Sequence, residues 1–131
     1  MTAPTLSKIL YVEDDPDIQA VAKMALEVVG GFTLKVCSSG QQALDEGEAF
    51  APDLLVLDVM MPGMDGPTTF VQLRKLPGLA ATPAIFMTAK VMPSDVARYK
   101  ELGAADVIAK PFDPMVLSVR IQEIWSECHV D

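Results

Sequence analysis

Polar side chains that could do chemistry stand directly after four short apolar runs of this sequence. Most are carboxylates, and carboxylates that lie close together raise one another's pKa unless a cation lies between them. Oxygen ligands with no histidine or cysteine nearby favour Mg²⁺ over a transition metal. The pattern therefore predicts a site for a divalent cation, provided that the runs end at one place in the fold. The residues are, in chain order, Glu13, Asp14, Asp15, Asp58, Thr88 and Lys110.

Several of these residues also have a simpler, structural interpretation. Asp15 precedes Pro16, and this pair is typical of a helix N-cap followed by proline at the first helical position. The Thr88 hydroxyl could bond its own backbone at a strand end, and Lys110 could be a solvated surface cation. Asp58 is harder to explain in this way, because an acid at the end of a buried strand and near other acids is electrostatically unfavourable.

The segment that follows Asp58 reads DVMMPGMDG and has the composition of a loop. Pro62 and Gly66 have the turn chemistry that such a loop requires, and Gly66 can take a positive φ. The methionines of the segment could form a soft-metal cluster, but the oxygen ligands nearby favour adaptable packing as their role. These methionines are Met60, Met61 and Met64.

The elements that must position these groups alternate along the chain between two hydrophobic periods. Apolar runs of strand length predict strands at 8–12, 32–36, 54–57, 84–87 and 106–109. Helical periodicity and capping residues predict helices at about 16–29, 40–49, 67–76, 93–103 and 114–127. The alternation predicts a doubly wound α/β fold, a five-stranded parallel sheet covered by helices on both faces. Ligand sites in such sheets lie beyond the carboxyl ends of the strands, so the polar side chains should meet there.

Length and composition limit the classes of function. A chain of 131 residues without linker or repeat is the size of one domain, and we expect a single domain over residues 1–131 with no output domain. The net charge of −8 disfavours direct binding to nucleic acid or to anionic membranes. Cys37 and Cys128 form neither a disulfide framework nor a metal motif. With no signal peptide or membrane-spanning run, we expect a cytoplasmic protein.

The residues at the strand ends carry a family resemblance. Glu13-Asp14, Asp58, Thr88 and Lys110-Pro111, together with the loop DVMMPGMDG, closely resemble the receiver domain of two-component response regulators. The resemblance covers essentially the whole chain. It implies a flavodoxin-like fold with strand order 2-1-3-4-5, as in the bacterial chemotaxis regulator.

The resemblance also implies a role for each residue. Asp58 would be the phosphoacceptor, attacking the phosphohistidine of a sensor histidine kinase or histidine phosphotransfer protein. Lys110 would pair with the phosphoryl oxygens, which would also accept from the Thr88 hydroxyl and the Ala89 N–H. The Lys110-Pro111 peptide bond would be cis. Mg²⁺ would be held by Glu13, Asp14, Asp58 and the backbone carbonyl of Met60. A shift of the acid pair by one place, to Asp14-Asp15, is the lesser alternative.

The sequence departs from the family at the switch position on the fifth strand. The usual aromatic residue there is replaced by Val107, which is too small to change much between buried and exposed states. We therefore expect signalling to use the fourth strand, the loop 89–93 and the helix that follows. On that helix, Tyr99 is predicted to be an exposed aromatic at the surface that binds a downstream protein partner.

Other classes of function fit the sequence less well. A phosphatase of the haloacid dehalogenase type needs a second acid at the position of Met60, so we expect a signalling domain and not an enzyme that turns over phosphoesters. A flavodoxin-like nucleotide binder would need a glycine-rich phosphate loop after a strand, and none is present. A receiver domain cut from a longer hybrid kinase or DNA-binding regulator remains an alternative.

Overall fold

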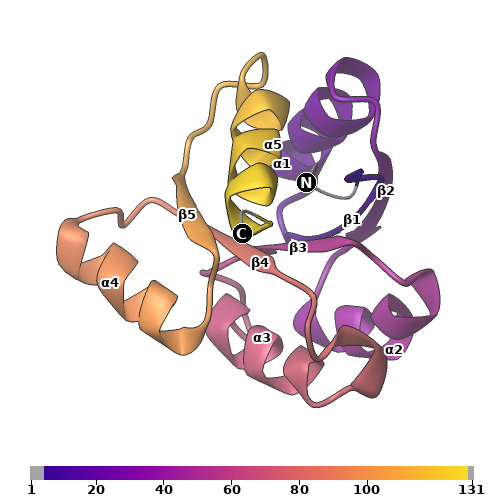
Figure 1. The fold of residues 1–131 in the computed structure, drawn as a ribbon, viewed down its shortest axis with the longest axis vertical. Coiled ribbons are helices and arrows are strands. Elements are labelled where there is room, and N and C mark those ends of the chain that lie inside the picture. The colour runs from indigo at the N-terminus through magenta and orange to yellow at the C-terminus, as the bar shows by residue number, and fades with distance from the viewer. Residues whose placement is uncertain (1–4, 130–131) are drawn as a thin grey trace.

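A five-stranded parallel sheet with the order β2-β1-β3-β4-β5 forms the centre of the computed structural model, which describes residues 5–129 (Figure 1). The strands are β1 (Lys8–Val12), β2 (Thr33–Cys37), β3 (Leu54–Asp58), β4 (Ala84–Thr88) and β5 (Asp106–Ala109). The order confirms the expected topology. Every residue of β3 and β4 is buried, as their unbroken apolar sequences predict.

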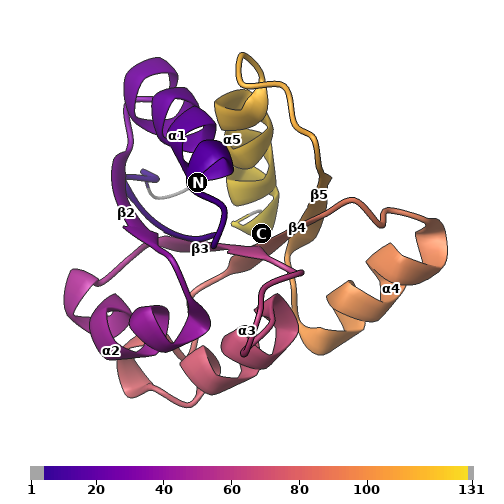
Figure 2. The same ribbon diagram turned by 180° about the vertical axis from the view of Figure 1, so that it is seen from behind.

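Two layers of helices cover the sheet. Helices α1 and α5 lie on one face, and α2, α3 and α4 lie on the other (Figures 1 and 2). The bounds are α1 (Pro16–Lys23), α2 (Gly40–Phe50), α3 (Gly66–Arg74), α4 (Pro93–Leu102) and α5 (Leu117–Cys128). Asp15 is the N-cap of α1, as expected, and its side chain accepts from the backbone N–H groups of Asp17 and Ile18. Within residues 5–129, no helix has the length and apolar composition of a membrane span.

The helix boundaries differ from the sequence prediction by one or two residues in α2, α3 and α4, and by more in α1 and α5. The segment Met24–Val29 continues α1 as a π-helix, with the Gly30 N–H bonded to the Ala25 carbonyl at 3.0 Å. At the other end of the chain, α5 begins at Leu117 and not near residue 114. The reason is a turn at 114–116, in which Asp113 accepts from the Met115 N–H through its side chain, at 2.9 Å. This side-chain bond belongs to the turn that precedes the helix, and the Leu117 N–H donates to the Asp113 carbonyl at 3.0 Å.

The alternation of side chains along each strand divides the core in two. On the face of α1 and α5, Ile9, Tyr11 and Val56 pack against the helices. On the opposite face, Leu10, Leu57 and Phe86 are among the residues of the second cluster. Since side chains two residues apart on a strand share a face, Glu13 lies on the same face as Tyr11.

Tyr99 corrects the expectation for α4. The prediction of an exposed aromatic is wrong, because only 5% of Tyr99 is exposed and its ring lies 5.4 Å from that of Phe86 in an edge-to-face arrangement. The neighbouring Arg98 guanidinium donates to the Tyr99 hydroxyl at 3.2 Å. Tyr99 is the buried residue of α4, so this side chain attaches the helix to the sheet.

Candidate functional site

The parallel register brings three of the predicted acids together. Val12 pairs with Leu57, and the same register continued by one residue places Glu13 beside Asp58. Glu13 is 1% exposed and Asp58 is 2% exposed, whereas Asp14 is exposed to solvent. One carboxylate oxygen from each of these acids lies within 4.8 Å of the others.

Lys110 connects the two buried carboxylates. Its Nζ lies 2.8 Å from Glu13 Oε1 and 2.8 Å from Asp58 Oδ1. The Lys110-Pro111 peptide bond is cis. The Lys110 N–H donates to the Thr88 carbonyl at 2.9 Å, which ties the end of β5 to β4. Lys110 is therefore an ion-paired residue of the site and not a free surface cation.

The site shifts the pKa of its buried groups. Burial is the main reason why the pKa of Glu13 rises to about 7, and the negative charge of Asp58 adds to the rise against the hydrogen bond from Lys110. Burial alone would lower the pKa of Lys110, but the hydrogen bonds to Asp58 and Glu13 raise it overall. The two buried carboxylates thus share a single ammonium group. Additional positive charge at the cluster would reduce the repulsion between them.

One oxygen of Asp58 has no hydrogen-bond partner. Asp58 Oδ2 is buried, and within residues 5–129 no group donates to it. A buried carboxylate oxygen without a donor is costly unless a ligand supplies one or a cation approaches. Together with the exposed carboxylate of Asp14 and an all-oxygen donor set, this orphaned atom fits a hard divalent cation such as Mg²⁺.

Thr88 and the loop after it lie at the end of β4. Thr88 is 1% exposed, and its hydroxyl accepts from the backbone N–H of Lys90 at 3.1 Å. The simpler interpretation of this hydroxyl, a bond to its own backbone, is therefore observed. Ala89 and Lys90 are exposed and follow the strand without regular structure, so the Ala89 backbone is accessible to a ligand.

Gly66 shapes the loop after Asp58, but not by a positive φ. The positive φ in this loop belongs to Gly63, at 76°. A Cβ on Gly66 would lie 2.4 Å from the Asp58 carbonyl oxygen, so glycine is required here for a close approach of two backbones. Met60 is 68% exposed beside Asp58, whereas Met61 is buried in the core, and the two methionines do not share one environment.

Two further residues lie at the site without a signal in the sequence, Gln19 and Tyr11. The Gln19 side chain on α1 donates to the Glu13 carbonyl oxygen and, at 3.2 Å, to the Ser38 hydroxyl. Tyr11 lies two residues before Glu13 on the same face of the sheet, 1% exposed within the core cluster of that face. A glutamine on a helix and a tyrosine in a strand have no signal of function in the sequence, because only the tertiary contacts distinguish them.

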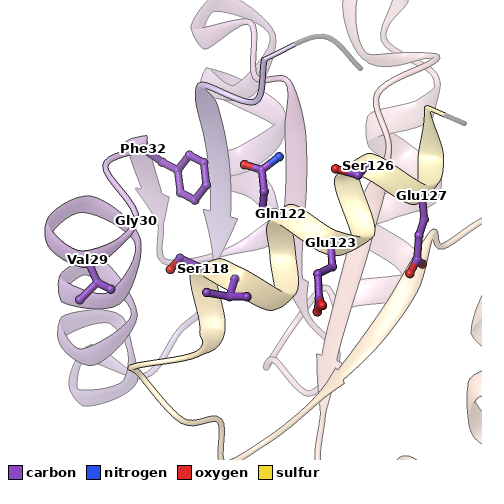
Figure 3. A pocket seen from close by; sticks show the side chains of 9 residues that line it. Val29, Gly30, Phe32, Ser118, Gln122, Glu123, Ser126 and Glu127 are labelled. Atoms are coloured by element: carbon purple, nitrogen blue, oxygen red, sulfur yellow. The ribbon is translucent and has the colours of Figure 1, made fainter. Parts of the chain in front are cut away.

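A pocket beside α5 lies apart from the acids of the site. It has a volume of about 590 Å³ and lies between α5 and the turn after the π-helix, as Figure 3 shows. Its lining includes Val29, Phe32, Ser118, Gln122 and Glu123, and none of the acids of the site. The chemistry of the described chain is therefore concentrated at the strand ends.

The fold and the site together define a class: a doubly wound α/β domain with a buried aspartate, an acid pair and a lysine at the carboxyl ends of its strands. The chain belongs to the response regulator receiver domain family, whose sequence model matches residues 9–122. This family consists of signalling domains of two-component systems, and its members generally bind Mg²⁺ at an acidic pocket.

Two curated relatives support the assignment to this family. The chain is 40% identical over 124 residues to the transcriptional regulatory protein CpxR of Escherichia coli, covering 95% of this chain and 51% of the relative. It is 38% identical over 117 residues to the alkaline phosphatase synthesis transcriptional regulatory protein PhoP of Bacillus subtilis, covering 89% and 48%. The chain thus spans about half the length of these curated relatives.

Solved structures match over nearly their whole length. The chemotaxis protein CheY4 of Vibrio cholerae superimposes with a TM-score of 0.84 at 26% identity, over 92% of this chain and 99% of that one. A response regulator from Chloroflexus aurantiacus gives a TM-score of 0.81 at 31% identity, over 92% and 98%. The strand order and the helical layers are those of this receiver fold.

Proposed function

We propose that Asp58 accepts a phosphoryl group from the phosphohistidine of a sensor histidine kinase or histidine phosphotransfer protein. The observation that carries this proposal is the environment of Asp58: the side chain is buried, Oδ1 is bonded to Lys110, and Oδ2 has no donor within the described chain. A carboxylate held in this way has one oxygen oriented by the lysine and one oxygen free to react or to bind a cation.

The transfer replaces one phosphorus bond by another. A carboxylate oxygen of Asp58 forms a bond to phosphorus, and the bond between phosphorus and the imidazole nitrogen of the donor breaks. The imidazole leaves with the electron pair and takes a proton from solvent. Lys110, the Thr88 hydroxyl and the Ala89 N–H stabilise the phosphoryl oxygens as hydrogen-bond donors. Catalysis by this chain consists of positioning and electrostatic stabilisation.

Glu13, Asp14, Asp58 and the backbone carbonyl of Met60 would hold Mg²⁺. When bound, the cation neutralises negative charge as the phosphoryl group approaches the carboxylates. Asp15 is engaged in capping α1, which supports Glu13-Asp14 over Asp14-Asp15 as the acid pair.

A cleft beside Lys110 supports a protein as the phosphoryl donor. It has a volume of about 250 Å³ and is lined by Ile18 and Val21 of α1 and by Pro111 and Phe112. Apolar side chains next to a reactive group favour a partner that brings an apolar surface together with its phosphohistidine. The signal must also reach a downstream protein. Because Val107 stands where the family has an aromatic switch residue, the sequence favours a change in β4, the loop 89–93 and α4 as the surface that this protein recognises.

A second candidate is a receiver domain within a longer regulator. The observation that favours it is that the chain spans 48% and 51% of two relatives whose names describe transcriptional regulation. Phosphorylation would then control an attached output domain, such as a DNA-binding one. In the first candidate, residues 1–131 are a single domain that acts through a separate protein and does not touch nucleic acid.

The phosphoacceptor can be tested by mass. The protein is incubated with Mg²⁺ and acetyl phosphate, and a gain of one phosphoryl group is expected. Asp58→Asn should abolish the gain, and Asp45→Asn, at an exposed aspartate of α2, should not. The proposal fails if the wild-type chain gains no phosphate and Mg²⁺ with beryllofluoride causes no change in its NMR spectrum.

A further inference from the structure

Tyr11 carries a buried hydroxyl without a partner. The residue is 1% exposed, and within residues 5–129 nothing accepts from or donates to its hydroxyl. Its neighbours in the sheet register are Val36 on β2 and Val56 on β3, whose side chains cannot accept a hydrogen bond. Buried hydroxyl groups are almost always hydrogen-bonded, so this one needs an explanation.

The acids of the site are the acceptors in the next row of the same face. Glu13 follows Tyr11 by two residues directly after β1, and Asp58 follows Val56 by two residues on β3, so by strand alternation both carboxylates belong to the face of the sheet that carries Tyr11. Burial raises the pKa of Tyr11, and the charges of Glu13 and Asp58 raise it further. The tyrosine is therefore within the electric field of the carboxylates.

Lys110 cannot serve all of these groups once Asp58 is phosphorylated. In the described structure its Nζ bonds Glu13 Oε1 and Asp58 Oδ1 at 2.8 Å each. Under the function proposed above, on which this step rests, the ammonium group turns to the phosphoryl oxygens. Glu13, 1% exposed, then keeps the Asp15 N–H at 3.3 Å from Oε2, but Oε1 loses its donor from the protein, and a buried carboxylate oxygen without a donor is costly.

We propose that Tyr11 is a positioning residue for Glu13, and that its hydroxyl donates a hydrogen bond to the Glu13 carboxylate when Lys110 is drawn to the phosphoryl group on Asp58. The buried hydroxyl then takes the place of the Lys110 ammonium group as a hydrogen-bond donor to Glu13. Glu13 is thereby kept in place in the phosphorylated state. Tyr11 itself touches neither the phosphoryl group nor its donor.

The spectroscopic test uses tyrosine labelled with ¹³C at Cζ, whose chemical shift reports hydrogen bonding of the hydroxyl. The chain contains two tyrosines, and the signals can be assigned with Tyr11→Phe and Tyr99→Phe. We expect the Tyr11 signal to move when Mg²⁺ and beryllofluoride are added together, and not with Mg²⁺ alone. An unmoved Tyr11 signal, in a protein whose backbone spectrum does respond, overturns the inference and leaves the phosphoacceptor function standing.

The binding test uses Tyr11→Phe, with Tyr99→Phe as the matched control. Affinity for beryllofluoride in the presence of Mg²⁺ should fall at least about tenfold in Tyr11→Phe, the factor expected for losing a hydrogen bond to a charged group. Affinity for Mg²⁺ alone, and both affinities of Tyr99→Phe, should stay near the wild-type values. Equal losses for Mg²⁺ and beryllofluoride in Tyr11→Phe would show a merely structural role and contradict the inference. A wild-type chain with no response to beryllofluoride would instead contradict the phosphoacceptor function itself.

Discussion

At the scale of single residues, the site depends on how few donors its carboxylates have. Glu13 and Asp58 are buried beside each other and share the ammonium group of Lys110. A buried acid pair with one cation is electrostatically incomplete, and this incompleteness is what a phosphoryl-transfer site with a divalent cation requires. The same groups in a solvated position would have no such preference for a ligand.

The raised pKa of Glu13 predicts a pH dependence of stability. Because the pKa rises from 4.5 to about 7 on folding, the native state binds the proton more tightly, and the resulting stabilisation is present below pH 4.5 and lost as the pH rises through about 7. A rise in pKa from 4.5 to about 7 corresponds to a stabilisation on the order of 3 kcal/mol. Urea unfolding in EDTA at pH 5 and pH 8 should show the wild type losing stability relative to Glu13→Gln. A difference between the two proteins that is constant with pH would contradict the shift.

Met60 is predicted to control the lifetime of the phosphorylated state. Its side chain is 68% exposed, two residues after the proposed phosphoacceptor Asp58, where it can obstruct water that would attack the acyl phosphate. We expect Met60→Ala to lose phosphate several times faster than the wild type, measured by mass after removal of acetyl phosphate. Met115→Ala, at an equally exposed methionine before α5, is the control. Unchanged decay in Met60→Ala would refute the prediction.

At the scale of elements, α4 has one buried side chain, that of Tyr99, and one ion pair to β5, between Lys100 and Asp106 at 3.7 Å. Tyr99 packs on Phe86 of β4, and Phe86 packs in turn on Phe70 of α3, with ring centroids 5.5 Å apart. Glu101, Leu102 and Tyr99 also line a cleft of about 630 Å³ that reaches Met60 in the loop after Asp58. A helix with one buried side chain beside the loop after Asp58, the proposed phosphoacceptor, is well placed to move when that loop changes.

Removing the anchor should loosen α4 more than the rest of the domain. Tyr99→Ala is expected to lower the free energy of unfolding by about 3 kcal/mol, as for other buried aromatic residues replaced by alanine. Tyr99→Phe keeps the packed ring and should cost less than about 1 kcal/mol, since it loses only the hydrogen bond from Arg98. Urea unfolding measures both values, and hydrogen exchange should show faster opening in 93–102. Equal effects of the two substitutions would mean that ring packing does not hold the helix.

At the scale of the whole molecule, part of the net charge of −8 is concentrated at one place. Most acids of the chain can be solvated at the surface, but the carboxylates of Glu13, Asp14 and Asp58 lie together. Their repulsion opposes folding unless a cation reduces it. In the sequence, the net charge only disfavours nucleic acid as a ligand. In the structure, part of that charge forms a cluster that can bind a cation.

Mg²⁺ should consequently stabilise the folded protein. A cation that binds only the native state raises Tm by mass action, and the rise should grow with concentration in the millimolar range. Asp14→Asn should reduce the rise, and NaCl at matched ionic strength should not reproduce it in the wild type. Thermal unfolding followed by circular dichroism measures the effect. A melting temperature indifferent to Mg²⁺ would argue against a native-state cation site.

The sequence by itself determined the elements and the position of the site along the chain. Apolar runs predict all five strands, and Asp15 with Pro16 predicts the start of α1, because these signals depend on neighbouring residues. The tertiary structure decided the contacts between distant residues. It placed Lys110 on Glu13 across 97 positions, buried Tyr99, and left the buried Tyr11 hydroxyl without a partner. Such contacts depend on strand register and helix packing, to which residues from the whole chain contribute, so no local pattern reveals them.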